Sequence, residues 1–210
     1  MAQPKDLTKL SDAEVGQRLP LPRPRHASTT SVEEAIVRRR SVRDFSPDPL
    51  GLAEISQLLW SAQGVTAAEG QRAAPSAGAR YPLETYLTCA QGLFRYEPHE
   101  HALIKVQAAD LRRPLADAAY GQSFISDAPV SFVFAAIYER TTSRYGDRGI
   151  RYVHMDVGHA AQNIHLQAEA LSLASVPVGA FDDGAVAQVL RLPADQQPVY
   201  IVPVGRPTPG

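Results

Sequence analysis

A single long helical pattern between about residues 150 and 173 constrains the fold of this chain more than any other feature. Its apolar residues recur at intervals of three and four, which is the spacing of one helix face: Val153, Val157, Ala160, Ile164, Ala168 and Leu171. Shortly before it, Val130–Tyr138 (VSFVFAAIY) is strongly apolar and rich in strand formers, so it predicts a buried strand. The chain therefore mixes helix and strand.

The remaining elements follow one another without a regular order. Ser31 and Glu34 match the S-x-x-E capping box, so a helix is expected to begin there and to run into the arginines that follow. The other expected elements are a helix at 51–63, a long loop at 64–82, a hairpin of 85–90 with 93–96, a helix at 110–120, a strand at 175–178, a helix at 183–190 and a strand at 198–204. Because helices and strands do not alternate steadily, the pattern favours the α+β class over a doubly wound fold.

Residues 1–30 are expected to form an extended N-terminal arm, followed by one domain over residues 31–210. Pro20, Pro22 and Pro24 alternate through LPLPRP, which favours an extended or polyproline path. Two interpretations of this arm stay open: a disordered tail, or a segment that wraps around a partner subunit.

The overall charge narrows the range of partners. The 210 residues carry a formal net charge of −1, whereas nucleic-acid binding needs a broad basic face, so nucleic acid is not an expected partner. No run approaches the roughly 18 consecutive apolar residues of a membrane helix, and the N-terminus lacks the apolar core of a secretory signal. We therefore expect a cytoplasmic protein. The one cysteine, Cys89, lies in an apolar run and is interpreted as an inert core thiol.

Against this nearly neutral background, the segment 38-RRRSVRDF-45 concentrates positive charge. Guanidinium groups bind phosphate through pairs of parallel hydrogen bonds and a serine hydroxyl adds another, so the candidate phosphate ligands are Arg39, Arg40, Ser41 and Arg43. If the helix continues, Arg39 and Arg43 share one face because they are four residues apart. The alternative is a solvated helix end whose arginines pair with neighbouring carboxylates.

A loop of small residues within 74-APSAGARYPLE-84 is the second candidate site. Pro75, Ser76, Ala77 and Gly78 would let a flat ligand approach the backbone closely. The segment superficially resembles the nucleophile elbow of serine hydrolases. No strand precedes Ser76, however, and Pro82 opposes a helix after it, so a hydrolase is disfavoured.

Two further candidates lie near the end of the chain. In 176-VPVGAFDD-183 a strand ends at Gly179 and Ala180, where small side chains leave backbone N–H groups open to a heteroaromatic ring; the alternative is an ordinary turn before a helix. Arg206, just after the last strand, is either another phosphate ligand or a surface residue. No metal site is expected, because the histidines at 154, 159 and 165 are spaced by five and six and so do not share one helix face as a zinc pair would. Glycine-rich dinucleotide and ATP motifs are also absent.

Taken in order, five segments resemble the FMN-dependent nitroreductase superfamily: RRRSVRDF, PSAGARYPLE, DVGHAAQN within the long helix, VPVGAFDD and the terminal PVGRP. The PSAGARYPLE loop and the LP-rich arm look most like its SagB-type branch. That branch includes dehydrogenases that oxidise thiazolines and oxazolines in modified peptides. The resemblance implies a nitroreductase-like fold, with a central mixed or antiparallel sheet flanked by helices, and an intertwined homodimer with FMN at the interface.

The resemblance also implies a role for each matching position. The FMN phosphate and ribityl chain would be held by Arg39, Arg40, Ser41 and Arg43, with Arg206 as a second phosphate ligand. The loop at 75–78 would contact the flavin of the partner subunit, and the backbone of Gly179 and Ala180 would lie beside the flavin N5 edge.

The chemistry that the resemblance implies is hydride transfer through the flavin, from NAD(P)H to a small electrophile such as a nitroaromatic or a quinone. The azoline dehydrogenases use a Lys-Tyr pair beside the flavin, and the matching residues here are Arg144 and Tyr145. Arginine stays protonated and is a poor base, so either Tyr145 acts without the lysine or the chain does other chemistry. Two alternatives remain: an azoline dehydrogenase acting on a modified peptide with a partner cyclodehydratase, and a non-catalytic flavin-binding protein.

Overall fold

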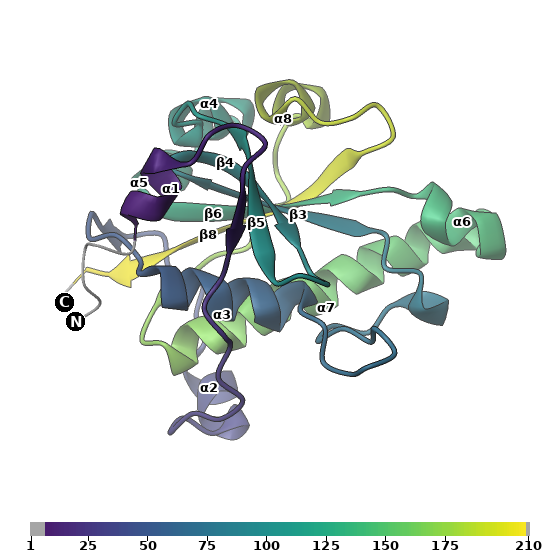
Figure 1. Cartoon of the computed structure of the whole chain (residues 1–210), viewed down its shortest axis with the longest axis horizontal. Helices are drawn as coiled ribbons and strands as arrows, with labels where there is room; N and C mark the ends of the chain where they lie inside the picture. Colours follow the sequence, from purple (N-terminus) through teal and green to yellow (C-terminus); the bar gives the residue numbers. More distant parts are fainter. Residues whose placement is uncertain (1–6, 209–210) are drawn as a thin grey trace.

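A computed structural model describes residues 7–208 and arranges them in three layers around one sheet (Figure 1). The sheet has 8 strands in the order β1-β5-β4-β3-β6-β8-β2, and the short β7 pairs with β8. Every strand pairing is antiparallel. The strands are β1 Arg18–Pro20, β2 Phe45–Ser46, β3 Leu83–Cys89, β4 Gly92–Glu97, β5 Ala102–Gln107, β6 Val130–Ala136, β7 Ala174–Ser175 and β8 Gln197–Pro207.

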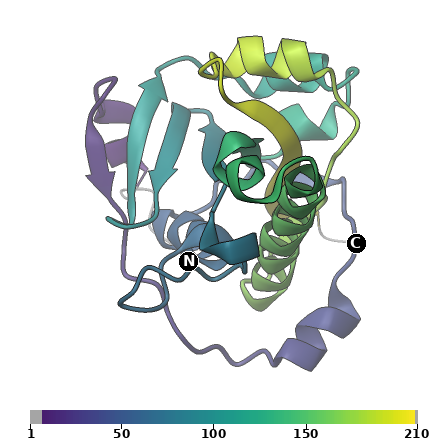
Figure 2. The ribbon, with the colours of Figure 1, turned by 90° about the vertical axis from the view of Figure 1, so that its right-hand side faces the viewer.

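Helices cover both faces of this sheet. On one face lie α3 (Leu52–Gln63) and α7 (Arg148–Ala170); the other carries α4 (Arg112–Ala118), α5 (Phe124–Asp127) and α8 (Asp183–Leu190) (Figure 1). The remaining helices are α1 (Thr8–Asp12), α2 (Val32–Arg38) and α6 (Glu139–Tyr145). Both ribbon views show α2 standing away from the sheet at the end of the extended stretch after β1 (Figure 2). The α+β class and the central antiparallel sheet flanked by helices, both expected from the sequence, are confirmed.

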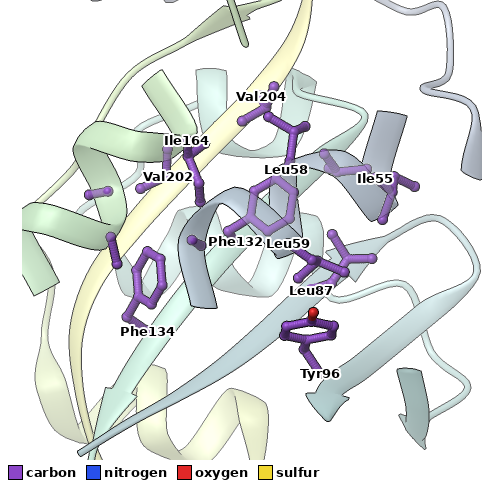
Figure 3. Packing of buried hydrophobic residues seen from close by; sticks show 14 of the residues in the cluster. Ile55, Leu58, Leu59, Leu87, Tyr96, Phe132, Phe134, Ile164, Val202 and Val204 are labelled. Carbon is purple, nitrogen blue, oxygen red and sulfur yellow. The ribbon is translucent and has the colours of Figure 1, made fainter. Parts of the chain in front are cut away.

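The long helix and the central strand β6 form the middle of the core. Phe132 and Phe134 point from β6 toward α3 and α7, where they pack with Leu58 and Ile164 (Figure 3). The intervening Val133 belongs to the cluster on the opposite face. Every residue of β6 is buried, which explains why its sequence is an unbroken apolar run instead of an alternating one. The predicted buried strand is thus confirmed.

The N-terminal segment differs from expectation, since folded structure begins well before Ser31. In α1, Leu10 is fully buried, and its carbonyl accepts a hydrogen bond from Lys105 Nζ at 3.0 Å. β1 forms one edge of the sheet through Leu19, which is paired with Leu103. The prediction of an extended arm is therefore wrong for these two elements. It fits residues 21–30, which form neither helix nor strand, and residues 1–6 lie outside the described part.

Most other predicted elements are present. The Ser31 hydroxyl caps α2 by accepting from Glu34 N at 3.1 Å, and the hairpin, the long loop and α8 are also confirmed. The predicted strand at 175–178 is shorter than expected: it consists of β7 and a single bridge between Val178 and Ile201. β5 was not predicted. Cys89 is buried, and burial raises the pKa of its thiol to about 11, as suits an inert core residue.

No helix in the described range 7–208 has the length and apolar content needed to cross a membrane.

Candidate functional site

The arginine segment leaves the helix before its candidate ligands. α2 ends at Arg38, and Arg39 already has extended dihedral angles (φ −48°, ψ 123°). Ser41 forms a parallel bridge with Ser175 of β7, supported by a hydrogen bond from Val42 N to Ser175 O at 3.1 Å. The helical face expected for Arg39 and Arg43 is therefore wrong. In extended backbone, alternate side chains point to the same side. Arg39, Ser41 and Arg43 would therefore share one side through the two-residue repeat of a strand and not through the repeat of a helix.

The first two arginines of the candidate set behave differently. Arg40 folds back on α2, because its Nη1 donates to the carbonyl oxygens of Val37 at 2.9 Å and Arg39 at 2.8 Å. It thereby satisfies carbonyls at the helix end that have no intrahelical partner. Arg39 lies close enough to His165 for its charge to help lower the histidine pKa.

Neither Arg39 nor Arg43 has a carboxylate partner. Among residues 7–208 no aspartate or glutamate makes an ion pair with either guanidinium, and Arg43 instead stacks over the Phe124 ring at 5.6 Å. Unpaired guanidiniums beside a serine hydroxyl are an arrangement that can hold a phosphate. The alternative interpretation, in which the arginines pair with neighbouring acids, applies only to Arg38, which pairs with Glu34.

Arg206 lies near the arginine segment, but its guanidinium is already bound to a carboxylate. β2 pairs with the end of β8, where Ser46 faces Arg206. The strand that follows the arginine segment is therefore paired with the C-terminal PVGRP segment. The Arg206 guanidinium, however, donates to both oxygens of Glu54 at 3.0 Å. Glu54 in turn caps α3 by accepting from Gly51 N at 2.6 Å. Arg206 can bind a phosphate only if it shares or exchanges this carboxylate.

The strand end at Gly179 and Ala180 is exposed, as the small side chains predict. The neighbouring bridge between Val178 and Ile201 fixes its position on β8. Ala180 O accepts from the side chain of Gln122 at 2.8 Å, so Gln122 holds this backbone in place. No sequence pattern points to Gln122, because it lies between two short helices and reaches Ala180 only through the tertiary fold.

The spacing of these groups suits a phosphorylated flavin. Ser41 is bridged to Ser175, and Gly179 follows four residues later, or roughly 13 Å away if the backbone is extended. Cationic side chains thus lie at one end of the segment and open backbone at the other, which is the arrangement needed for a phosphate joined to a flat ring through a short chain. On the described residues, the site fits FMN.

The small-residue loop has a different position, beside the N-terminal half of α7. Ser76 Oγ accepts from Tyr81 N at 2.9 Å, and hydrogen bonds from Ser76 and from the Ala77 backbone work against the rise in the Asp156 pKa that burial causes. The loop contains the short 3₁₀ helix η2 (Ala77–Ala79), and no strand leads directly into Ser76. Asp156 therefore anchors this loop to α7.

One chain does not bring the loop and the arginine segment together. The loop contacts α7 at Asp156, whereas the arginine segment meets its far end through Ser175, whose hydroxyl is hydrogen-bonded to His165 at 2.8 Å. At 1.5 Å per residue, these two positions are roughly 13 Å apart along the helix axis.

Tyr145 lies next to this loop. A Cβ on Gly78 would be 2.5 Å from the Tyr145 hydroxyl, so the two residues are in direct contact. The Tyr145 ring is flanked edge-on by Tyr152 at 5.1 Å and by the Arg144 guanidinium at 5.5 Å. The Arg-Tyr pair is thus held at one end of α6 against the predicted flavin-contacting loop.

A second tyrosine was missed by sequence reasoning. The Tyr138 hydroxyl is hydrogen-bonded to His154 Nε2 at 2.8 Å, and burial together with the charge of Asp183 raises the tyrosine pKa. Asp183 begins α8 directly after the Gly179 strand end, so this pair lies on the same side of the molecule. In the described part of the chain, no group of three His, Cys, Asp or Glu residues is arranged to hold a metal.

Comparison with known proteins agrees with this architecture. The model of the Nitroreductase family matches residues 36–206. MJ1384 of Methanocaldococcus jannaschii, a protein named for the nitroreductases, is 44% identical over 181 residues, which is 83% of this chain and 90% of that protein. A crystal structure from Ralstonia eutropha, also named for the nitroreductases, superposes with a TM-score of 0.85 at 29% identity and covers 94% of this chain and 93% of its own. This chain therefore belongs to the nitroreductase family.

Peptide-processing proteins are more distant relatives. The microcin B17-processing protein McbC of Escherichia coli is 27% identical over 140 residues, which is 61% of this chain and 51% of McbC. The E. coli microcin synthetase McbBCD complex, with truncated pro-MccB17 bound, gives a TM-score of 0.72 at 22% identity and covers 99% of this chain and 83% of its own. The latter likeness shows the shared fold. Family membership supports an oxidoreductase.

Proposed function

We propose that this chain is an FMN-dependent oxidoreductase that passes hydride from NAD(P)H to a small electrophile such as a nitroaromatic or a quinone. The observation that carries the proposal is the pair of unpaired guanidiniums of Arg39 and Arg43 around Ser41, one extended segment away from the open backbone of Gly179 and Ala180. When bound, the flavin supplies the redox chemistry at its N5 atom.

The chain's own residues bind and orient. Arg39 and Arg43 neutralise the phosphate and Ser41 donates a hydrogen bond to it, which fixes one end of the cofactor. The backbone N–H groups of Gly179 and Ala180 face the ring at the other end. Donors fixed in advance, where negative charge develops on the reduced ring, stabilise that charge without reorganisation.

A direct test combines cofactor binding with turnover. The purified protein is titrated with FMN, then assayed with NADH and NADPH against a panel of nitroaromatics and quinones. The proposal predicts a yellow protein that consumes reduced nicotinamide only when an acceptor is present. A preparation that stays colourless after FMN addition would refute it, and bound FMN that no donor reduces would favour the non-catalytic alternative.

We further propose that the active unit is a homodimer. In one chain the small-residue loop lies beside Asp156 and the arginine segment lies near His165, nine residues further along α7; a second copy would place the loop of one subunit against the flavin held by the arginines of the other. The separated helix α2 also exposes apolar residues that a partner would cover: Val32 is 65% exposed, Ile36 56% and Val37 70%.

Subunit mixing tests this shared site. An Arg43→Ala chain and a chain with a disrupted loop, Gly78→Trp, are each expected to be inactive alone. In a mixed dimer one site carries both defects while the other has intact residues from both chains, so unfolding and refolding the two together should restore activity. If mixing restores none, the two segments serve the same subunit's site.

A second candidate function is the oxidation of azolines in a modified peptide. It is favoured by the contact of Tyr145 with Gly78, which holds the residue matching the family's catalytic tyrosine against the predicted flavin-contacting loop. It is also favoured by the similarity to McbC, named as a microcin B17-processing protein. The test is incubation of the FMN-loaded protein with an azoline-containing peptide: loss of two hydrogens by mass, with little NAD(P)H turnover, would select this function over the first.

A further inference from the structure

A cavity of about 340 Å³ opens between β3 and β4, and none of the residues assigned to the flavin lines it. The two strands are paired from Cys89 opposite Gly92 to Tyr86 opposite Arg95. Beyond that point β3 continues back to Leu83, but its pairing with β4 stops. The strands separate there, and the loop at 64–82 together with α6 closes the space between them. We call this space the wedge cavity.

The carboxylates that face the wedge cavity are already neutralised. Glu84, which is half-buried, accepts from Arg140 Nη2 at 2.6 Å, and Arg95 lies 4.0 Å from its other oxygen. Glu97 is paired with the same Arg95 at 2.6 Å. Both acidic groups of the wall therefore have arginine partners of their own.

Two further guanidiniums line the cavity without any carboxylate. Among the described residues, Arg80 makes no ion pair and donates only to neutral oxygens, those of the Arg140 carbonyl at 2.6 Å and the Ser143 hydroxyl at 3.4 Å. Arg72 likewise has no ion pair, and its one side-chain hydrogen bond within residues 7–208 goes to Gln63 Oε1 at 3.0 Å. The wall thus carries an excess of positive charge.

Of the two cations, Arg72 loses more of its hydration in the folded protein. Its guanidinium stacks on the Tyr81 ring at 4.6 Å, its Nε is covered and lacks an acceptor within the described chain, and burial lowers its pKa. The charge of Glu84 offsets this effect only in part, and that carboxylate is already paired with Arg140, so Arg72 loses hydration without an ion-pair partner of its own among the described residues. Thr85 adds a second unsatisfied group: the residue is 2% exposed, lines the same cavity, and its hydroxyl has no partner in residues 7–208.

We propose that the wedge cavity is a binding site for a small oxyanion, either a carboxylate or a phosphate ester, held by Arg72 and Arg80. Planar guanidinium groups recognise both anions through paired hydrogen bonds, and an anion here would give Arg72 the direct ion-pair partner that it does not have among the described residues. The two arginines lie on either side of the loop at 75–78. An anion that joins them therefore holds the two ends of the predicted flavin-contacting loop together, which links this site to the position of that loop.

Calorimetric titration of the full chain with inorganic phosphate, at constant ionic strength and with saturating FMN present so that the predicted flavin site is filled, tests the wedge cavity. We expect Arg72→Gln and Arg80→Gln each to weaken phosphate binding by about tenfold or more, the effect of losing a charge-assisted hydrogen bond. Arg113→Gln, on exposed α4, should bind as the wild type does. Competition by succinate would then identify a carboxylate as an accepted ligand, and its absence would restrict the site to phosphate.

Three results would overturn the proposal. These are no phosphate binding by the wild type at millimolar concentration, unchanged binding in both Arg72→Gln and Arg80→Gln, and equal loss in all three variants, which would mean unspecific charge attraction. Circular dichroism verifies folding of each variant. If Arg72→Gln does not fold, Arg80→Gln decides, because its side chain is exposed and is not part of the core.

Discussion

The hydroxyl of Tyr145 lies against Gly78, where a Cβ would be 2.5 Å from the tyrosine oxygen. Gly78 also has a φ of 59°, in the left-handed region that residues with a Cβ rarely adopt. Both the backbone conformation and the contact therefore exclude a side chain. This contact fixes the end of α6 to the small-residue loop of the same chain.

Replacing Gly78 by alanine should destabilise the protein by more than the left-handed backbone alone, which costs about 1–2 kcal/mol, because the new methyl group displaces Tyr145. Gly121→Ala is the matched control: its φ is 73°, and no atom would lie within 4 Å of the added Cβ. Urea unfolding of both variants measures the difference. In a Tyr145→Phe background the gap should narrow, since the closest atom is gone; equal costs for the two glycines would contradict the contact.

If the arginine segment holds FMN, Arg43→Ala should weaken FMN binding by about 1.5–3 kcal/mol, or roughly tenfold to more than a hundredfold in Kd. The physical reason is the loss of a charge-assisted hydrogen bond to the phosphate. Fluorescence titration with FMN gives the Kd, and riboflavin, which has no phosphate, provides the control. Riboflavin affinity should be unchanged; an unaltered Kd for FMN would remove Arg43 from the site.

Arg40→Ala should behave differently, because Arg40 donates to the carbonyls of Val37 and Arg39 at the end of α2. We expect a loss of about 0.5–1.5 kcal/mol in unfolding free energy and a smaller effect on FMN binding than in Arg43→Ala. Measuring both quantities in both variants separates the two roles. A larger loss of FMN affinity in Arg40→Ala would show that Arg40 leaves the helix end when the phosphate binds.

The sequence predicts the parts of the fold whose signals are local. The long helix is visible from its repeating apolar residues, β6 from its uninterrupted apolar run, and the start of α2 from Ser31. In contrast, α1 and β1 have 5 and 3 residues, too few to show periodicity, and their stability comes from tertiary contacts such as Lys105 Nζ to Leu10 O.

The same distinction, between local sequence signals and contacts made only by the tertiary fold, applies to the candidate site. Motif resemblance points to Arg43, whose guanidinium has no acidic partner among residues 7–208. Gln122 and the Tyr138–His154 pair escape sequence reasoning, because each contact forms only when the tertiary fold brings two different elements together. The ion pair of Arg206 with Glu54 could not be foreseen either, since the two residues meet only when β8 passes α3.

That ion pair gives a further prediction. If Arg206 is a phosphate ligand, Glu54 competes with the phosphate for it, and Glu54→Gln should tighten FMN binding by several-fold, on the order of 1 kcal/mol. Glutamine keeps an oxygen for the cap on Gly51 N, so α3 should still form. FMN titration of the variant is the measurement. Weaker or unchanged binding would show that Arg206 serves the fold and not the cofactor.

His165 makes the stability of the protein depend on pH. The side chain is 3% exposed, and burial, together with the nearby charge of Arg39, lowers its pKa to about 4. In the unfolded chain the same group has a pKa of about 6.5. Between these values the unfolded state binds a proton that the folded state does not, so this contribution to stability is present at neutral pH and lost as the pH falls.

The expected loss from His165 between pH 7 and pH 4 is about 3 kcal/mol. In His165→Gln this loss is absent, so the stability difference between wild type and variant should shift by that amount over the same range, as measured by urea unfolding at each pH. Comparison at each pH cancels the other titrating groups, among them Asp156, whose pKa is raised. An NMR titration of the His165 ring provides the direct measurement: a pKa close to 6.5 in the folded protein would contradict the prediction, because the ring would then be able to accept a proton without opening the core.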